Sequence, residues 1–191
     1  MGTEIKIEVF ALFEADEYFY CYAFERNPSV TTNAHLLEVL RHLPSSIEQR
    51  RMMLKVLHFL RKARDGKPFW YDKWHASPYY ATEAVIRASA GLANDLIRPA
   101  VQWILENQHE DGSWGFAGGN AEETALAALA LIEAAREDPA LPSLIRVPLE
   151  RAYHYLALHW QDEVPSLWIG KALYSPSNIV RATILGALDA L

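Results

Sequence analysis

The stretch Trp103-Ile-Leu-Glu-Asn-Gln-His-Glu-Asp-Gly-Ser-Trp-Gly115 is the most specific local pattern in the sequence. An apolar run ends at Gln108, and a polar turn then delivers Gly112 and Trp114. A glutamine amide can hydrogen-bond to carbonyls left exposed at a helix end, and a Trp ring can stack on the amide plane. The alternative interpretation is an ordinary helix C-terminus followed by a buried Trp. Both interpretations predict that a helix ends here and that the chain turns sharply.

Capping signals divide the rest of the chain into further helices. Asn120 and Glu123 have the spacing of a capping box, and Ser77-Pro78 and Ser175-Pro176 each look like an N-cap followed by proline at the first helical position. No segment shows sustained period-two alternation, so no sheet is expected. A further helix is expected within the first twenty residues. The predicted helices span 32–43, 46–64, 78–92, 98–108, 121–136, 147–160 and 176–190.

Short loops between these helices favour an antiparallel array. Some helices are rich in Ala and Leu on more than one side, as over Ala125 to Leu131, and such a helix needs neighbours on both sides. We therefore predict one all-α domain over residues 1–191, whose antiparallel helices form part of an (α/α) barrel. Seven or eight helices are too few to close a large ring.

Composition excludes several classes of protein. The formal net charge of −6 argues against a nucleic-acid partner, because phosphate binding needs a basic surface. The single cysteine, Cys21, cannot form a disulfide within the chain or hold zinc alone. No apolar run approaches the roughly 20 residues of a membrane span, and the mixed charges of the first ten residues do not fit a signal peptide. We expect a cytoplasmic protein.

Four stretches carry a family resemblance. The stretch from 103 to 115, with Arg98 before it, resembles the QW repeat of triterpene cyclases and their relatives, where it is a structural clasp. Residues 24–35, 72–82 and 167–174 resemble three segments of bacterial class II diterpene cyclases of the copalyl diphosphate synthase type. The four occur in family order, and the resemblance runs from about residue 10 to the end. It implies the C-terminal portion of the β domain of a class II terpene cyclase.

The resemblance implies an isomerase reaction of diterpene biosynthesis. The family protonates a terminal alkene of a prenyl diphosphate, and the expected reaction converts geranylgeranyl diphosphate to a bicyclic, copalyl-type diphosphate. The family's acid is an Asp-x-Asp-Asp motif, which this sequence lacks. The nearest acidic run, Glu14-Ala-Asp16-Glu17, has the wrong order. We expect the acid upstream of Met1 in homologues, so the chain is a fragment, a split subunit or an inactive relative, and is inactive alone.

Two residues of this chain match family positions beside the catalytic acid. His35 matches the residue that hydrogen-bonds the catalytic Asp, where an imidazole can orient the carboxyl proton and stabilise the carboxylate left behind. Thr31 matches a second neighbour of that acid. The alternative for His35 is a histidine at the edge of the core that is satisfied by a backbone carbonyl.

Aromatic side chains form the second group of candidates. An apolar cavity offers a carbocation only π faces, each worth roughly 0.5–2 kcal/mol. Trp168 leads because it matches a cavity-wall Trp of plant relatives; these have an acidic residue two positions earlier, where this chain has Ser166. The alternative for each residue is core packing. The substrate-cavity candidates are Trp168, Trp74, Tyr79, Tyr80, Trp70 and Tyr174.

Diphosphate and metal binding are weakly represented. Lys171 could reach a phosphate or be an ordinary solvated lysine. Glu122-Glu123 is explained by helix capping and the helix dipole. Asp72 and His75, taken with His109 or Asp111, match no usual zinc spacing. We expect no metal on this chain, and Mg²⁺ only in the complete enzyme.

Two alternative functions stay open. The chain could be a non-catalytic helical interaction module or split-enzyme subunit, which the missing acid favours. It could also be a fragment of a triterpene cyclase of the squalene-hopene type, although the stretches Trp74–Tyr80 and Trp168–Lys171 favour the diphosphate branch. An incomplete ring exposes an apolar face, so the expected partners are the upstream half of a cyclase, a second chain or a second copy.

Overall fold

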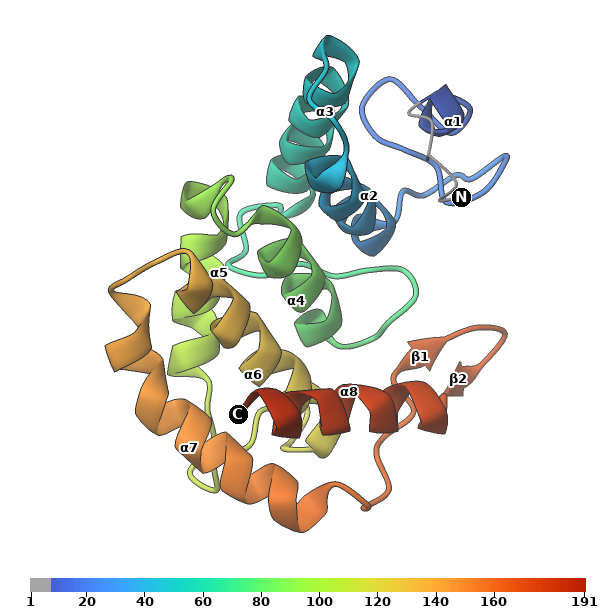
Figure 1. The fold of residues 1–191 in the computed structure, drawn as a ribbon. Coiled ribbons are helices and arrows are strands. Elements are labelled where there is room, and N and C mark those ends of the chain that lie inside the picture. Colours follow the sequence, from blue (N-terminus) through green and yellow to red (C-terminus); the bar gives the residue numbers. More distant parts are fainter. Residues whose placement is uncertain (1–7) are drawn as a thin grey trace, which may run out of the picture.

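The structure, a computed structural model, describes residues 8–191, and its regular secondary structure is almost entirely helical. The helices form two layers that curve as an arc (Figure 1). The inner layer contains α2, α4, α6 and α8, each packed on the next, while α3, α5 and α7 pack behind them. The elements are α1 Glu8–Ala11, α2 Val30–His42, α3 Ile47–Ala63, α4 Pro78–Ser89, α5 Asn94–Glu106, α6 Ala121–Arg136, α7 Leu141–His159, β1 Trp168–Ile169, β2 Leu173–Tyr174 and α8 Ser177–Ala190.

The all-α prediction is confirmed. The differences lie at helix boundaries, such as α4, which ends at Ser89 and not at the expected 92, and in one hairpin. Helix α7 begins six residues before the expected 147, so Pro148 lies inside it and Pro142 occupies its first turn. Helix α5 likewise starts before the expected 98 and contains Pro99. In the first twenty residues, the described part contains only the four-residue α1; residues 1–7 lie outside the described range.

The expectation that the chain contains no sheet was wrong by one small element. Strands β1 and β2 pair antiparallel, with Trp168 opposite Tyr174. The hairpin also binds the loop before α4, because the Ile169 amide donates to the Trp74 carbonyl at 2.9 Å and the Ala76 amide to the Leu167 carbonyl at 2.7 Å. These strands are only two residues long, too short for the alternation that would reveal a strand.

A buried tryptophan fixes the loop in front of an inner helix, and the arrangement occurs twice. The Trp114 amide donates to the Thr124 hydroxyl of α6 at 2.9 Å, and its indole Nε1 donates to the Ile104 carbonyl at 2.7 Å. Trp70 makes the same pair of bonds, to Thr82 of α4 at 3.1 Å and to the Leu60 carbonyl at 2.8 Å. The amide of buried Phe19 donates to the Asn33 side chain of α2 at 2.9 Å, which repeats half of the pattern.

The stretch 103–115 forms a clasp, but Gln108 bonds to the turn and to a neighbouring helix, not to the carbonyls at the end of α5 as expected. Gln108 Nε2 donates to the Gly112 carbonyl at 2.9 Å and to the carbonyl of Pro148, inside α7, at 2.8 Å. Arg151 of α7 donates in return to the His109 carbonyl at 2.8 Å. The clasp therefore fastens the turn after α5 to the side of the next outer helix, α7, which contacts α6 and α8.

Replacing Thr124 by valine tests the hydrogen bond that joins the Trp114 amide to the Thr124 hydroxyl, because valine has nearly the size of threonine but no hydroxyl group. The substitution leaves the buried Trp114 amide without its acceptor, which should lower the free energy of unfolding by about 1–3 kcal/mol. Urea unfolding measures the difference. Thr183→Val on α8 is the matched control, since among residues 8–191 the partly exposed Thr183 hydroxyl donates only to the Ile179 carbonyl of its own helix. Equal stabilities of the two variants would show that the clasp does not hold the loop.

Candidate functional site

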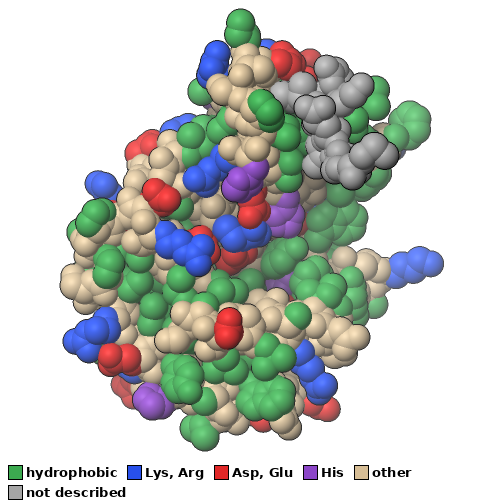
Figure 2. Space-filling view, in the orientation of Figure 1, with side chains coloured by type: hydrophobic (Ala, Val, Ile, Leu, Met, Phe, Trp, Pro, Cys, Tyr) green, Lys and Arg blue, Asp and Glu red, His purple; other side chains and the backbone are tan. Residues whose placement is uncertain are grey.

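The inner helices line a hollow of about 580 Å³ on the concave side of the arc. Basic, acidic and histidine side chains gather across the middle of this face, with hydrophobic side chains next to them (Figure 2). The hollow thus combines an ionic wall from α2 and α4 with a largely apolar wall from α6 and α8. The lining residues are His35, Tyr80, Glu83, Arg87, Leu126, Leu129, Asn178, Ile179, Ala182, Thr183 and Gly186.

His35 faces this hollow from α2. The side chain is exposed at the concave surface and makes no hydrogen bond to any residue in the range 8–191, so the backbone-carbonyl alternative is not realised there. Burial against the wall lowers the pKa of His35 from its ordinary value of 6.5, and the nearby Arg87 guanidinium lowers it further. The imidazole is therefore neutral at pH 7 and has a ring nitrogen that can accept a proton or hydrogen bond.

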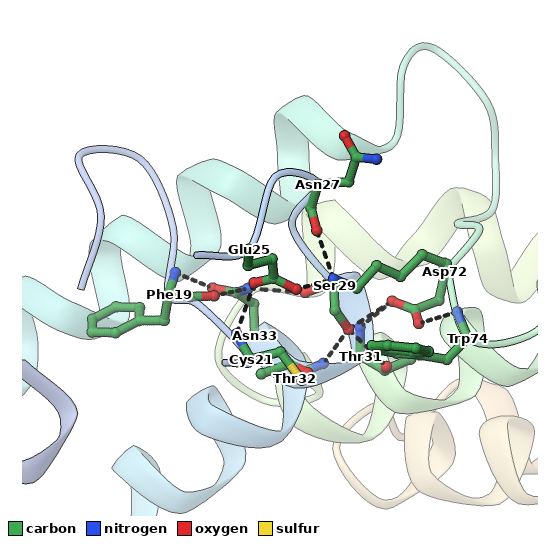
Figure 3. A network of polar contacts seen from close by, with 11 residues as sticks. Phe19, Cys21, Glu25, Asn27, Ser29, Thr31, Thr32, Asn33, Asp72 and Trp74 are labelled. Carbon is green, nitrogen blue, oxygen red and sulfur yellow. Dashed lines mark hydrogen bonds and ion pairs between the residues drawn. The ribbon is translucent and has the colours of Figure 1, made fainter. Parts of the chain in front are cut away.

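Thr31 lies one turn before His35, within a buried polar network at the start of α2 (Figure 3). The Thr31 amide donates to Asp72 Oδ1 at 3.0 Å, and the hydroxyl of the N-cap Ser29 donates to the same oxygen at 2.9 Å. The second Asp72 oxygen accepts from the Trp74 amide at 3.0 Å. Asp72 therefore fixes the start of the helix that bears His35 to the loop that precedes α4.

Arg87 joins two carboxylates at the middle of the hollow. Its Nε donates to Glu83 at 2.9 Å, one turn earlier on α4, and its Nη1 pairs with Glu38 of α2. Burial raises the pKa of Glu83 above its usual range, and the Arg87 charge opposes this rise only in part. This triad of Glu38, Glu83 and Arg87 has two acidic groups and one basic group close to His35, and it joins α2 to α4.

Tyr80 is the one predicted aromatic residue among those that line the hollow, and two aromatic rings pack against it. The His75 ring stacks against Tyr80 with ring centroids 4.8 Å apart, and Trp168 contacts Tyr80 at 4.9 Å. The Trp168 indole donates to Glu122 Oε1 at 2.8 Å. Burial raises the pKa of Tyr80 to about 12, so the phenol stays neutral. Trp168 thus lies beside the cavity wall.

The other predicted residues lie elsewhere. Trp70 and Tyr79 are buried in the core between the layers. There the Trp70 indole donates to the Leu60 carbonyl, and Tyr79 packs on Trp103. Trp74 is half-buried, with the Lys73 ammonium 4.9 Å from its ring. Tyr174 and Lys171 are exposed on the hairpin and are not among the residues that line the hollow. For Trp70 and Tyr79 the structure favours the core-packing alternative.

A second, apolar groove of about 330 Å³ reaches His35 from the other side. Three large apolar side chains on its wall are exposed: Val9, Phe13 and Val39. Leaving such side chains in water is unfavourable, and a contiguous apolar surface of this kind indicates a contact site. The groove runs between α1, α2 and the loop that contains Phe19 and Tyr20.

Comparison with known proteins identifies the family. Residues 21–152 match the squalene-hopene cyclase C-terminal domain family. The chain belongs to this family. Labda-7,13-dienyl diphosphate synthase of Streptomyces clavuligerus is 38% identical over an alignment that covers the whole chain and 36% of that enzyme. The type B diterpene cyclase of Mycobacterium tuberculosis is 37% identical over 92% of the chain and 35% of that protein.

The structural comparison agrees with this membership. The ent-copalyl diphosphate synthase from Streptomyces platensis superposes with a TM-score of 0.83 at 33% sequence identity, over 95% of this chain and 37% of that one. This cyclase domain therefore spans a little over a third of the length of these relatives. The resemblance stated from the four sequence stretches is confirmed, as is the terpene cyclase fold.

The sequence did not predict which buried residues lie behind the aromatic side chains of the cavity wall. Glu122 and His75 are buried beside Trp168, although their spacing suggested only capping and an unsuitable zinc set. Arg87 and Glu83 sit four residues apart on α4, a spacing that puts them on one face, and this signal could have identified half of the triad.

The pKa of His35 provides a test of this electrostatic arrangement. Replacing Arg87 by methionine should raise the pKa of His35 toward 6.5, because a positive charge that opposes the imidazolium is removed. Titration of the His35 ring by NMR, assigned with His35→Gln, measures the change. Arg61→Met on the outer helix α3 is the control.

A second consequence concerns stability. The folded state disfavours the His35 imidazolium, so this histidine's contribution to stability is present above pH 6.5 and is lost as the pH falls through its lowered folded pKa. His35→Gln should therefore flatten this part of the pH dependence. A His35 pKa above 6.5 in the unmodified domain would contradict the arrangement.

Proposed function

We propose that this chain forms one wall of the protonating domain of a class II diterpene cyclase. The substrate would be geranylgeranyl diphosphate, and the product a bicyclic, copalyl-type diphosphate. The observation that carries the proposal is the concave hollow, in which neutral His35 and Tyr80 face the same space in a chain related to diphosphate-forming diterpene cyclases. The stretches around Trp74 and Trp168, where the chain resembles the diphosphate branch, favour this over the triterpene alternative.

The geometry suits a helper of the acid. A carboxylic acid protonates an alkene only if its proton is aimed and its conjugate base is stabilised. His35 offers a ring nitrogen to such a carboxyl group, and Thr31 lies one turn away on α2. His35 would thus orient the proton and stabilise the carboxylate after transfer, while Tyr80 presents a π surface to the cation.

The carboxylates of the hollow are poor candidates for the acid itself. Burial raises the pKa of Glu83, which makes it a weaker acid, and Arg87 holds it in an ion pair. Glu38 pairs with the same guanidinium. Since the sequence also lacks Asp-x-Asp-Asp, we place the proton donor on a complementary part of the enzyme, either the upstream half of a cyclase or a second chain.

Metal and diphosphate binding also belong to the complementary part in this proposal. Within residues 8–191 no group of three or more His, Cys, Asp or Glu side chains is placed to hold a metal ion. Lys171 is exposed at the hairpin turn, and we retain it only as a weak candidate for a phosphate contact.

The apolar groove beside His35 supports the proposal that a partner completes the site. Its exposed Val9, Phe13 and Val39 would be covered by the part that brings the acid. The same groove also fits the second candidate function, a non-catalytic interaction module, and a homodimer would cover it as well.

No helix among the described residues could cross a membrane. A cytoplasmic location is part of the proposal.

A chimaera tests the cyclase proposal. The chain replaces the matching 36% of the Streptomyces clavuligerus labda-7,13-dienyl diphosphate synthase, and products from geranylgeranyl diphosphate are identified by mass spectrometry after dephosphorylation. We expect a bicyclic diphosphate from the chimaera and none from the isolated 191-residue chain. Product from the isolated chain would show that the proton donor lies within it.

Variants of the chimaera test the role of His35. His35→Ala should reduce turnover at least tenfold, because the acid loses the group that orients its proton. His58→Ala, on the exposed side of α3, is the matched control and should leave turnover unchanged. Unchanged turnover in His35→Ala would remove this residue from the mechanism. A folded chimaera that binds no substrate would instead favour the interaction module.

A further inference from the structure

Glu122 is a buried carboxylate that helix capping does not explain. It lies in the first turn of α6 and is only 2% exposed. The capping position of this helix is filled by Asn120, whose side chain accepts from the Glu123 amide. Glu122 instead accepts from the Trp168 indole at 2.8 Å, from a segment 46 residues later in the chain.

His75 supplies a second contact to the same oxygen. Its Nδ1 lies 3.1 Å from the Ser77 amide nitrogen, which can donate to it, and 3.3 Å from the Ser77 carbonyl oxygen. The shorter of the two contacts favours Nδ1 as an acceptor and a proton on Nε2, which lies 3.4 Å from Glu122 Oε1. One carboxylate oxygen thus faces two N–H groups, from two aromatic rings that both contact Tyr80.

The second oxygen of Glu122 completes the picture. Oε2 is buried and has no hydrogen-bond partner within residues 8–191. A buried polar atom of this kind is unfavourable for stability and therefore calls for an explanation. No Lys or Arg forms an ion pair with Glu122 in the same range, so the groups that contact its other oxygen are the Trp168 indole and the His75 ring.

We infer that Glu122 is a positioning residue that holds Trp168 and His75 around Tyr80 and makes this aromatic wall more attractive to a cation. A carboxylate bonded to an indole N–H both fixes the ring and increases the electron density of its π face. A buried negative charge behind the wall also attracts a positive charge in front of it. The inference rests on the proposed function and adds the group that supports its cation-stabilising surface.

This assignment also accounts for a departure from the sequence pattern. Plant relatives were expected to have an acidic residue two positions before the tryptophan, where this chain has Ser166. Here the carboxylate beside Trp168 comes from α6 instead. The hairpin is thereby fastened to an inner helix by the residue that also contacts the loop bearing His75.

Glu122→Gln in the active chimaera separates charge from shape. Glutamine keeps an oxygen acceptor for the indole but removes the negative charge. We expect an unchanged melting temperature, turnover at least fivefold lower and a larger share of prematurely deprotonated products. Glu133→Gln, on the same helix and paired only with nearby Arg136, is the control and should match the unmodified chimaera.

A double-variant comparison shows whether Glu122 acts through Trp168. In a Trp168→Phe background, which lacks the indole donor, Glu122→Gln should lower turnover by a clearly smaller factor than in the unmodified chimaera, because only the contact to His75 and the charge itself remain. Equal effects in both backgrounds would overturn the inference, and so would unchanged turnover and products in Glu122→Gln alone.

An NMR readout distinguishes failure of this inference from failure of the proposed function. In ¹⁵N-Trp-labelled chimaera, the Trp168 indole proton, assigned with Trp168→Phe, should move upfield in Glu122→Gln as the charged acceptor is lost. This signal does not depend on turnover. An inactive chimaera with the expected shift would refute the cyclase proposal and retain the Glu122 contact, whereas an unmoved signal would refute the contact itself.

Discussion

The arc depends on buried backbone amides that find their acceptors on the next inner helix. Phe19, Trp70 and Trp114 each precede an inner helix, and each amide donates to a side chain on its first or second turn: Asn33, Thr82 or Thr124. A buried amide without an acceptor is costly, so each loop is held in one position relative to its helix. Since the inner helices carry the cavity residues, this constraint also sets where the cavity residues lie.

Buried carboxylates then connect the start of one inner helix to a segment that lies later in the chain. The N-cap Ser29 of α2 donates to Asp72 at 2.9 Å, and the N-cap Ser77 of α4 donates to Glu123 at 2.5 Å. Each of these serines thus caps its own helix and also binds an acidic side chain from later in the chain. Burial of both acids removes competing water, so these contacts fix the spacing between successive inner helices.

The sequence predicted most of the fold because helix signals are local. Caps at Ser77 and Asn120 and the apolar run of α6 lie within one segment each, and the structure has them as expected. One helix start was predicted wrongly: the helix expected from 147 begins at Leu141, and Pro148 lies inside it, where its carbonyl accepts from Gln108. That long-range contact has no counterpart in local spacing.

The site was harder to predict for the same reason. Matching positions to the family suggested His35, and the need for aromatic rings in an apolar cavity suggested Tyr80; the structure puts both on one hollow. Trp70 was equally plausible as an aromatic residue, but its indole bonds to Leu60 in the core. Glu122 and Trp168 are 46 residues apart and meet only because the hairpin folds back onto the loop before α4.

The hairpin is attached to loops and to one carboxylate, while the arc is held by helix packing and its clasps. Changes in the hairpin can therefore alter the surroundings of Tyr80 while the helices keep their positions. In this chain the hairpin can therefore reshape one side of the hollow without a change in the packing of the inner helices.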